Sequence, residues 1–580
     1  MTKRLLIASY LIILVFIIIL LRLWQLQILE GDRYKKLSES NRLRIIKTPP
    51  PRGIIYDRNG LPLVKNVPFF SVLLSPEAID TIDVNALARL LDINKEELSE
   101  KLNKRNISPF VPIKLKMGIS FEEVAKIEAH KSDFQGLFVE TEVGRHYIYG
   151  KSGAHIIGYL GKIRHLHGGD LQGFPTDALV GQWGVEAVFD KDLRGIPGGR
   201  VVEVDAIGRE LRLISETQPI KGKDIHLSID IRLHKLIEEA FGNKAGAVVA
   251  FKVDTGEILA LDSMPSFDPN QFAKGISNRD WNTLINDPKK PMLNRALQSQ
   301  YPPGSTFKMI TALAALEESV VSTDWTTYCT GGLTYGSWTF GCWMKGGHGV
   351  VNFHRAIVES CDVYFYEVGK RLGIDKIYKY AILFGLGSET GINLTPVSER
   401  KGLIPNAKWK SDVKKMSWYL GDTFISAIGQ GFVLATPIQM ARMTAAMVNG
   451  GYLLTPTLLR GTKGQITKID VKEENLKIIK AAMYGVVNEP GGTAKSAKSS
   501  IVEIGGKTGT SQVVGKKKGL KGEKYMDHAW FIAFAPVDNP EIALAVFVEH
   551  GGGGGAVAAP IAKRVIEAYF KPGGISDTKD

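Results

Sequence analysis

The sequence predicts a mixed α/β (α+β) protein in which helices cover an antiparallel sheet, carried on an elongated pedestal behind one N-terminal transmembrane helix. Three observations predict it: an apolar run at the N-terminus, strand-like segments at both ends of the C-terminal part, and more than 200 residues of mostly helical pattern between them. Strands from both ends of a domain can form one sheet that the helical part covers. A composition of 44% hydrophobic and 23% charged residues excludes disordered, collagen-like and multi-span transporter classes.

The apolar run extends from Leu5 to Leu21 without a charged residue. A helix of this length spans about 25 Å, and Arg22 and Trp24 at the interface extend it to the roughly 30 Å of a bilayer core. No small-residue cleavage site follows, which favours an uncleaved anchor at residues 5–23 over a signal peptide. Because residues 1–4 carry two basic side chains, the positive-inside rule places them in the cytoplasm and the rest of the chain outside.

Residues 24–220 are expected to form the pedestal. A proline stretch and an Asn-Gly turn between Thr48 and Gly60 predict extended chain and a hairpin. Short amphipathic patterns predict an inserted helical subdomain at about 76–150. Strand-like segments return at GLFVETEV, HIIGYLGKI and GRVVEVDA, and a turn after Lys221 marks the domain boundary.

Residues 221–575 are expected to form a two-part α/β domain. GAVVAFKVDTGEILALDS predicts two strands around an Asp-Thr-Gly turn. GGKTGTSQVV, HAWFIAFAP and EIALAVFVEH predict three more strands, and PIAKRVIEAYF predicts a closing helix. An active site is expected in the groove between the sheet and the helical part.

Ser305 and Lys308 lie one turn apart at the start of an apolar helical pattern, so they share a face. A serine at a helix N-terminus is surrounded by backbone N–H groups, and a nearby lysine can take its proton if its pKa falls towards neutrality. Each unit of that fall costs about 1.4 kcal/mol, so burial or a second cation must supply several kcal/mol.

The S-x-x-K pattern alone is weak, because it also occurs at Ser398, Ser411 and Ser576. Only Ser305 is followed in order by Ser360-Cys-Asp362 and by the strand-like sequence beginning at Lys507. The resulting set predicts a complete nucleophilic site. Its members are Ser305 as nucleophile, Lys308 as base, Ser360 as proton relay, Lys507 as second cation, and Asp362, Thr508, Gly509 and Thr510 as substrate-binding or oxyanion residues, with the N–H groups of Ser305 and Thr510 forming an oxyanion hole.

This motif set resembles that of penicillin-binding proteins and β-lactamases. PRGIIYDRNG and GVEAVFDKDLRG resemble class B penicillin-binding proteins, and GDTFISAIGQGFVLATPIQMA, GGTAK and DHAWFIAFAP resemble their elongation type, the penicillin-binding protein 2 group. One position differs from the general pattern, because the second motif ends in Asp362 instead of Asn. An additional carboxylate changes the local charge and the substrate contact expected there.

The resemblance implies a serine D,D-transpeptidase of cell-wall elongation and rod-shape maintenance that is inhibited by β-lactams. It forms an acyl-enzyme on Ser305 from a D-Ala-D-Ala stem peptide and passes the acyl group to an amine. The implied partners are peptidoglycan stem peptides on lipid-linked glycan strands, a RodA-type glycan polymerase, other elongation-complex proteins and the bilayer, but no nucleic acid. The alternatives are a β-lactam-hydrolysing or β-lactam-sensing relative and a non-catalytic wall scaffold. The formal charge of +13 also suits anionic lipid or acidic wall polymer.

All three cysteines of the chain lie close together in sequence with one histidine: Cys329, Cys342, His348 and Cys361. Cys₃His is a ligand set of closed structural zinc sites. The alternative is a disulfide between two of the cysteines, with a third buried thiol and His348 at the surface. Some relatives of the elongation type have a metal here, so the resemblance favours structural zinc.

Overall fold

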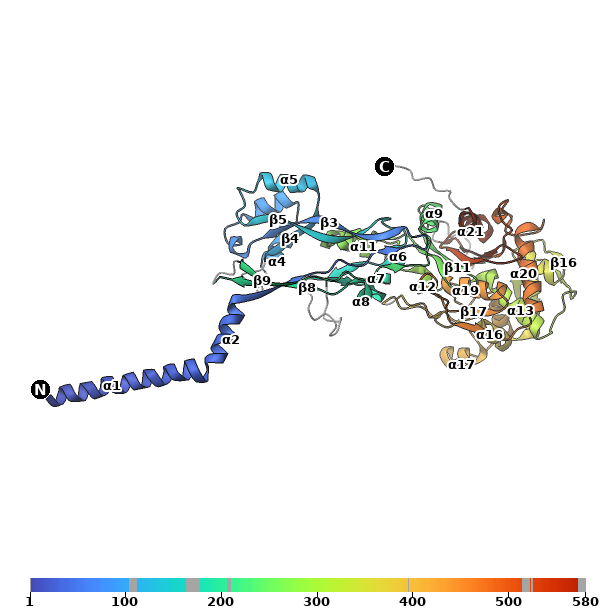
Figure 1. Cartoon of the computed structure of the whole chain (residues 1–580). Helices are drawn as coiled ribbons and strands as arrows, with labels where there is room; N and C mark the ends of the chain where they lie inside the picture. Colours follow the sequence, from blue (N-terminus) through green and yellow to red (C-terminus); the bar gives the residue numbers. More distant parts are fainter. Residues whose placement is uncertain are drawn as a thin grey trace.

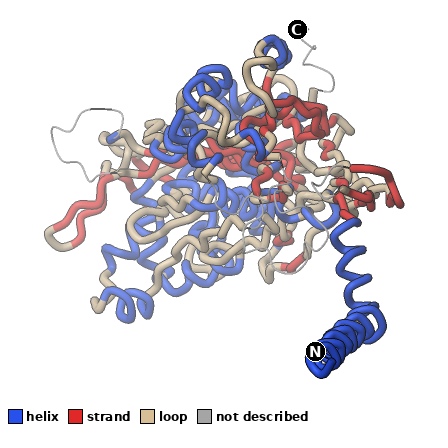
Figure 2. Tube along the Cα trace, turned by 90° about the vertical axis from the view of Figure 1, so that its left-hand side faces the viewer, coloured by secondary structure: helices blue, strands red, loops and turns tan. Residues whose placement is uncertain are grey.

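The chain forms an elongated molecule with the anchor helix at one end. The computed structural model describes residues 2–103, 112–162, 178–205, 210–394, 396–513, 522 and 525–571. Helix α1 (Thr2–Trp24) projects away from the other elements in Figure 1, and Figure 2, viewed from the N-terminal end, shows it almost end-on. The apolar helical stretch Lys3–Leu29 is long enough to cross a membrane. Helix α2 (Gly31–Arg42) then leads into the pedestal.

Two sheets form the pedestal. One has the strand order β1-β8-β9, and the other has the order β10-β2-β3-β4 with β5 paired to β3. The longest pairing is antiparallel and runs from Val64 opposite Tyr147 to Leu74 opposite Leu137. The strands of both sheets are β1 (Leu43–Thr48), β2 (Ile55–Tyr56), β3 (Pro62–Leu74), β4 (Ile113–Ile119), β5 (Leu137–Tyr147), β8 (Gly198–Val204), β9 (Glu210–Thr217) and β10 (Ile225–His226).

The segment predicted as a helical insert contains both helices and a strand. Its helices are α3 (Val84–Leu91), α4 (Lys95–Leu102) and α5 (Phe121–Ala129). Strand β4 was not expected between α4 and α5. Its side chains at Ile113, Leu115 and Ile119 are buried and alternate with more exposed ones, which is the period of a half-buried strand.

The strand predicted across HIIGYLGKI is only partly correct. Its first residues form the single helical turn α6 (Ala154–Ile157), and only its end forms β6 (Leu160–Lys162), which pairs with β7 (Leu179–Gly181). Gly153 and Gly158, at φ 72° and 81°, flank the turn. Both glycines adopt left-handed backbone, which ends an extended segment on either side of the helical turn.

The sheet predicted from both ends of the C-terminal part is confirmed. Its strand order is β12-β11-β21-β20-β19, and every pairing is antiparallel. β19 is therefore an edge strand. The strands are β11 (Gly246–Lys252), β12 (Ile258–Met264), β19 (Gly505–Ser511), β20 (His528–Ala535) and β21 (Ile542–Val548).

Helices cover both faces of this sheet (Figure 1). α9 and α21 pack on one face, and α19 and α20 pack on the other, next to the buried helix α13. Every residue of β20 and β21 is buried, as expected for strands covered on both sides. The helices are α9 (Ile231–Phe241), α13 (Lys308–Glu317), α19 (Pro437–Val448), α20 (Glu473–Asn488) and α21 (Gly554–Phe570).

Candidate active site

Ser305 lies in the short 3-10 turn η3 (Gly304–Phe307), immediately before helix α13. Lys308 is the first residue of α13, and it is fully buried because residues 308–316 of this helix all lie in the core. Ser305 is only partly buried. The helix thus fixes a lysine in the interior while its preceding turn presents the serine to solvent.

Two glycines allow the Ser305 turn to lie directly against β19. A Cβ atom on Gly304, whose φ is +55°, would lie 2.6 Å from the Thr510 carbonyl oxygen. A Cβ atom on Gly509 would lie 2.7 Å from the Pro303 carbonyl oxygen. Both distances are shorter than any side chain tolerates, so glycine at both positions brings the first and third motifs together.

Ser360 lies between the two lysines. Lys507 Nζ donates to Ser360 Oγ at 2.8 Å, and Lys308 Nζ lies 3.3 Å from the same oxygen. Lys308 also donates to the Ser360 carbonyl oxygen at 2.9 Å. Three segments that are far apart in the sequence therefore meet at one hydroxyl group, as the motif order predicts.

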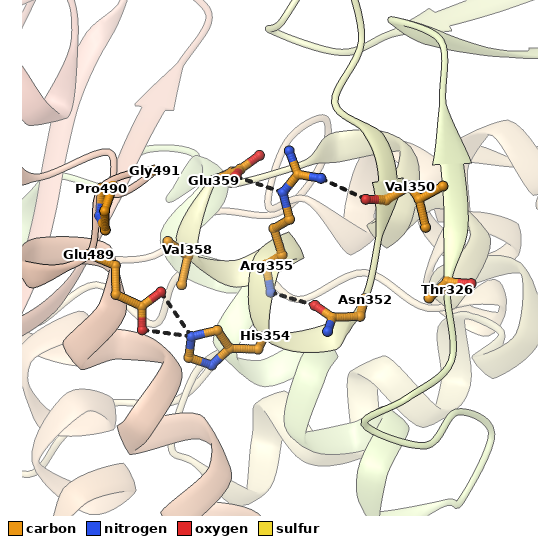
Figure 3. A pocket seen from close by; sticks show the side chains of 10 residues that line it. All are labelled: Thr326, Val350, Asn352, His354, Arg355, Val358, Glu359, Glu489, Pro490 and Gly491. Atoms are coloured by element: carbon orange, nitrogen blue, oxygen red, sulfur yellow. Dashed lines mark hydrogen bonds and ion pairs between the residues drawn. The ribbon is translucent and has the colours of Figure 1, made fainter.

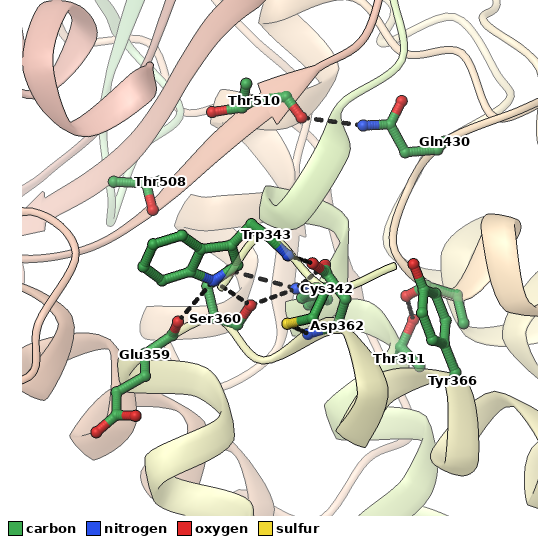
Figure 4. Close-up of polar contacts among 12 residues, drawn as sticks. Thr311, Cys342, Trp343, Glu359, Ser360, Asp362, Tyr366, Gln430, Thr508 and Thr510 are labelled. Carbon is green, nitrogen blue, oxygen red and sulfur yellow. Dashed lines mark hydrogen bonds and ion pairs between the residues drawn. The ribbon is translucent and has the colours of Figure 1, made fainter. Parts of the chain in front are cut away.

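Asp362 is buried and has partners on both carboxylate oxygens. Lys308 Nζ lies 2.7 Å from Oδ1. The backbone N–H of Trp343 donates to Oδ2 at 3.0 Å (Figure 4). This carboxylate is a counter-ion for Lys308 within the fold. The contact between Asp362 and substrate that the sequence analysis expects stays a prediction.

Trp343 was missed by the sequence analysis and contacts the second motif directly. Its indole N–H donates to the carbonyl oxygens of Glu359 and Ser360, both at 3.1 Å (Figure 4). The ring is 54% exposed. Trp343 is one of two tryptophans in this Gly-rich loop, and neither is part of a recognisable sequence pattern. Only the adjacent Cys342 could have drawn attention to it.

Burial lowers the pKa of the Lys507 amine well below its ordinary value, and the charge of Lys308 lowers it further. The nearby carboxylate of Asp362 opposes this effect. The two amines therefore repel each other, and Lys507 is the one whose pKa is lowered. The lowered pKa that the sequence analysis expects of Lys308 stays a prediction.

The edge strand β19 lies against the turn that carries Ser305. Thr510 is exposed, and its carbonyl oxygen accepts from Gln430 Nε2 at 2.9 Å. Thr508 is held by Thr493, with the two hydroxyl oxygens 2.8 Å apart. An edge strand offers unpaired backbone groups to which an extended peptide can add as a further strand. Thr493 belongs to the GGTAK segment that the sequence analysis used only for resemblance.

The Cys/His cluster lies beside the second motif. The four ligand atoms of Cys329, Cys342, His348 and Cys361 lie within 4.8 Å of one another. His348 Nδ1 is 3.6 Å from the sulfur atoms of both Cys329 and Cys342. Zinc–sulfur and zinc–nitrogen bonds of about 2.3 and 2.0 Å place tetrahedral ligand atoms roughly 3.5 Å apart, which matches. All three thiols are free, so the disulfide alternative is not formed here.

The electrostatics of this cluster favour a thiolate. A hydrogen bond from the Cys361 thiol lowers the pKa of Cys342 to about 2. The resulting contact with Cys342 raises the pKa of His348 to about 9 and that of Cys361 above its ordinary value. Thiolate sulfur is the form that binds metal.

The other S-x-x-K matches lie in different surroundings. Ser411 and Lys414 lie on the short helix α17 (Ala407–Lys414), away from the lysine pair. Ser398 precedes this helix in a loop, and Ser576 lies outside the described residues. Among the S-x-x-K serines that the structure describes, only Ser305 therefore combines a helix start with the second and third motifs.

Comparisons with known proteins identify the family of both domains. Residues 246–567 match the family described as penicillin binding protein transpeptidase domain, and residues 47–227 match the penicillin-binding protein dimerisation domain. The chain belongs to the penicillin-binding protein transpeptidase family. The matched regions correspond to the C-terminal domain with the lysine pair and to the pedestal.

Individual penicillin-binding proteins are similar over nearly the whole chain. The peptidoglycan D,D-transpeptidase MrdA of Salmonella typhimurium strain LT2 is 35% identical over 98% of this chain and 96% of its own. The Helicobacter pylori penicillin-binding protein PBP2, solved in complex with MreC, superposes with a TM-score of 0.78 at 31% identity over 91% of this chain and 98% of that chain. A chain from a structure titled as a peptidoglycan synthase complex has a TM-score of 0.73 at 32% identity, with 100% of both chains covered.

Proposed function

We propose that this protein is a membrane-anchored serine D,D-transpeptidase that cross-links peptidoglycan stem peptides during cell-wall elongation. One observation carries the proposal: the Ser360 hydroxyl group lies 2.8 Å from Lys507 Nζ and 3.3 Å from Lys308 Nζ, beside the turn that presents Ser305. The transpeptidase family and the MrdA relatives support it. β-Lactams, which resemble an acyl-D-Ala-D-Ala end, are expected to acylate the same serine.

In the first half-reaction Ser305 Oγ attacks the carbonyl carbon of the penultimate D-Ala. Lys308, the proposed base, first passes its own proton through the Ser360 hydroxyl group to Lys507 and then takes the hydroxyl proton of Ser305. The backbone N–H groups of Ser305 and Thr510 stabilise the oxyanion. Ser360 passes a proton between the amines and the leaving nitrogen. When the C–N bond breaks, D-Ala leaves as the free amine, and an ester remains on Ser305.

The lysine pair makes this chemistry possible near neutral pH. The lowered pKa of Lys507 supplies a group that can exchange its proton through Ser360, because burial and the charge of Lys308 both disfavour its charged form. Asp362 keeps Lys308 in position through its 2.7 Å contact. Thr508, Gly509 and Thr510 on the edge strand β19 hold the extended donor peptide by backbone pairing.

Ser305→Ala tests the nucleophile. The variant should lose all labelling by a fluorescent penicillin, while its melting temperature changes little because the hydroxyl is partly exposed and packs weakly. Ser411→Ala is the matched control, since it removes an S-x-x-K serine outside the site and should label like wild type. Labelling that persists in Ser305→Ala, or that is lost from Ser411→Ala instead, would contradict the assignment.

The lifetime of the acyl-enzyme separates this proposal from its rivals. A transpeptidase should keep the penicilloyl group for hours, a β-lactam hydrolase should release it within milliseconds to seconds, and a scaffold should never form it. A hydrolase needs a further base that activates water. Asp362 is a carboxylate of this site, and its two oxygens already have Lys308 and the Trp343 N–H as partners, at 2.7 and 3.0 Å.

A structural zinc ion bound by Cys329, Cys342, His348 and Cys361 is the second part of the proposal. Cys361 lies between Ser360 and Asp362, and Cys342 precedes Trp343, so the ion would pin the loop to the second catalytic motif. The donor set and the 3.6 Å spacings support it. Catalysis itself needs no metal in this scheme.

His348→Ala tests the zinc site. Wild-type protein purified without chelator should contain about one zinc per chain by elemental analysis, and the variant should lose it, melt at a lower temperature and acylate more slowly. The control is His354→Ala, a half-exposed histidine outside the cluster, which should keep the metal. Zinc-free wild-type protein, or mass spectrometry that finds a disulfide among these cysteines, would contradict the site.

The domain order supports a placement at the inner membrane. Residues 1–4 lie in the cytoplasm, residues 5–23 span the bilayer, residues 24–220 form the pedestal and residues 221–575 form the transpeptidase domain outside. The substrates are stem peptides on lipid-linked glycan strands. A RodA-type polymerase and other elongation-complex proteins are the expected partners, supported by the relatives solved with MreC and in a peptidoglycan synthase complex.

A further inference from the structure

The loop after helix α18 (Leu420–Ala427) lies against the turn that carries Ser305. The backbone N–H of Gly304 donates to the Gly429 carbonyl oxygen at 2.9 Å. A Cβ atom on Gly429 would lie 2.3 Å from the Gly304 carbonyl oxygen, so glycine is required for this close approach. The contact holds the next residue of the loop, Gln430, beside the active site. The mechanism described above gives Gln430 no role.

The side chain of Gln430 reaches strand β19. Its Nε2 donates to the Thr510 carbonyl oxygen at 2.9 Å (Figure 4). The backbone N–H of Gln430 donates to the Ile425 carbonyl oxygen at 3.1 Å, so the backbone is fixed and the carboxamide is the part that can turn away. Gln430 is only partly buried and Thr510 is exposed, so a ligand can reach this hydrogen bond.

The Thr510 carbonyl group lies on the free edge of β19, which pairs with β20 on its other side. The carbonyl oxygens of Thr508 and Thr510 both accept from side chains, from Lys507 Nζ at 3.0 Å and from Gln430 Nε2 at 2.9 Å. Residues two apart in a strand direct their backbone groups to the same edge. Both carbonyl groups therefore face away from β20, and both are already hydrogen-bonded in the free protein.

The donor peptide needs the same Thr510 carbonyl group. In the proposed mechanism the Thr510 N–H binds the oxygen of the scissile carbonyl group. Two residues that form a hydrogen-bonded pair in an antiparallel sheet exchange both of their N–H to C=O bonds. The N–H of the penultimate D-Ala is therefore expected to donate to the Thr510 carbonyl oxygen, at the place that Gln430 Nε2 fills.

We propose that Gln430 is a specificity-determining residue whose carboxamide binds the Thr510 carbonyl group until a donor with a backbone N–H displaces it; this inference rests on the proposed transpeptidase function. The carboxamide N–H is chemically the same kind of donor as a peptide N–H. A donor peptide thus replaces the hydrogen bond that it breaks. A ligand without an N–H at this position leaves the bond from Gln430 in place.

The test compares acylation by two β-lactams. Benzylpenicillin carries an amide N–H on the carbon next to the lactam carbonyl group, whereas penicillanic acid sulfone has no side chain there. Second-order rate constants for acylation of full-length protein in detergent are measured by intact-protein mass spectrometry. Gln430→Met keeps the length of the side chain and removes its N–H donor.

Gln430→Met should raise the rate constant for benzylpenicillin about fivefold, because the ligand no longer has to displace one hydrogen bond. The rate constant for penicillanic acid sulfone should stay nearly unchanged. Gln430→Ala is the second variant, and it should give the same pattern without the bulk of a methionine side chain.

Gln182→Met is the matched control, because it removes the same chemical group from the pedestal. There the Gln182 Nε2 atom lies 3.5 Å from the Gly161 carbonyl oxygen. This variant should react like wild type with both β-lactams.

His354→Gln is a control within the catalytic domain. It changes a contact of 2.9 Å between His354 Nε2 and Glu489 in a pocket of about 430 Å³, between helix α14 (Phe353–Val358) and the segment after α20 (Figure 3). The residues that line this pocket include none from β19 or from the Ser305 turn. Acylation by both β-lactams should therefore match wild type.

An unchanged or lowered rate constant for benzylpenicillin in both Gln430 variants would overturn the proposal, because the carboxamide would then not compete with the ligand. An equal rise for the two β-lactams would also overturn it, because the amide N–H of the ligand would then be irrelevant. Wild-type protein that neither β-lactam acylates would instead contradict the proposed function.

Discussion

Ser360 has a backbone conformation that a serine rarely adopts. Its φ is +59°, in the left-handed region, which costs a non-glycine residue about 1 kcal/mol or more. The carbonyl oxygen of this residue accepts from both Lys308 Nζ and the Trp343 indole N–H. These bonds hold the strained turn, and the turn aims the hydroxyl group at the two amines.

We therefore predict that Trp343→Phe slows acylation by fluorescent penicillin about tenfold. The change keeps an aromatic ring and removes the indole N–H, which is shared between the carbonyl oxygens of Glu359 and Ser360. Loss of this bifurcated hydrogen bond, worth about 1–1.5 kcal/mol, loosens the position of Ser360. Because the ring is 54% exposed, the melting temperature should fall by only a few degrees. The control is Trp338→Phe on strand β15 (Trp338–Gly341), where the ring is 74% exposed. Equal acylation rates in the two variants would contradict a positioning role for Trp343.

Residue types and spacing were sufficient to select the residues that meet in the site. Ser305, Lys308, Ser360 and Lys507 follow in a fixed order, and each motif carries recognisable neighbours. Trp343 could not be found this way, because its importance depends on the left-handed turn at Ser360. The internal pairing of Asp362 was equally hidden, since a sequence does not tell which direction a carboxylate faces.

At the scale of elements, the pedestal is held by one buried charge network. Glu186 on helix α7 (Gly184–Val188) lies 2.8 Å from Arg52 and 2.7 Å from Arg145 on β5. Arg52 also reaches Asp190 at 2.7 Å. The network ties the chain before β2 and strand β5 to helix α7, which precedes strand β8 of the β1-β8-β9 sheet. Burial alone would raise the pKa of Glu186, but the two arginines outweigh it and lower the pKa.

Glu186→Gln should destabilise the pedestal by about 3–5 kcal/mol, because two buried guanidinium groups lose their shared counter-ion. The pH dependence has a defined sign. The pKa of Glu186 is lower in the folded state than in the unfolded chain. Its contribution to the free energy of unfolding is therefore complete above the ordinary pKa of 4.5, and it is lost as the pH falls through the lower folded-state pKa. Melting temperatures measured between about pH 7 and pH 3 should converge for the variant and wild type towards the acid end. Glu239→Gln, at an exposed position, is the control. Parallel curves over the whole range would contradict the assignment.

Helices and strands were predicted correctly where the hydrophobic pattern in the sequence was long, and they were missed where it was short. β20 and β21 are continuous apolar strands bounded by turns, and both were expected. β4 was missed because its alternation of apolar and polar residues is short, includes two lysines and lies between segments with a helical pattern. The single turn α6 contains too few residues for any period to be read, and its flanking glycines decide its conformation.

At the scale of the whole molecule, the anchor and the catalytic domain occupy opposite ends (Figure 1). In the apolar helical stretch Lys3–Leu29, no residue of the most apolar segment is buried against the rest of the described chain. A bilayer would cover these exposed apolar side chains, whereas Lys308 and Lys507 are fully buried in the C-terminal domain. Membrane attachment and acylation are expected to be separable properties.

Removal of residues 1–29 tests this separation. The shortened protein should be soluble without detergent and should form the penicillin acyl-enzyme at a rate within twofold of the full-length protein, because no described catalytic contact involves α1. Sedimentation with membranes should be lost at the same time. The control keeps the length of the helix and its apolar character but reverses the order of residues 5–21, and it should still sediment with membranes. A truncated protein that folds, as judged by an unchanged melting temperature, yet acylates more than tenfold slower would show that the anchor end is coupled to the lysine pair through the pedestal.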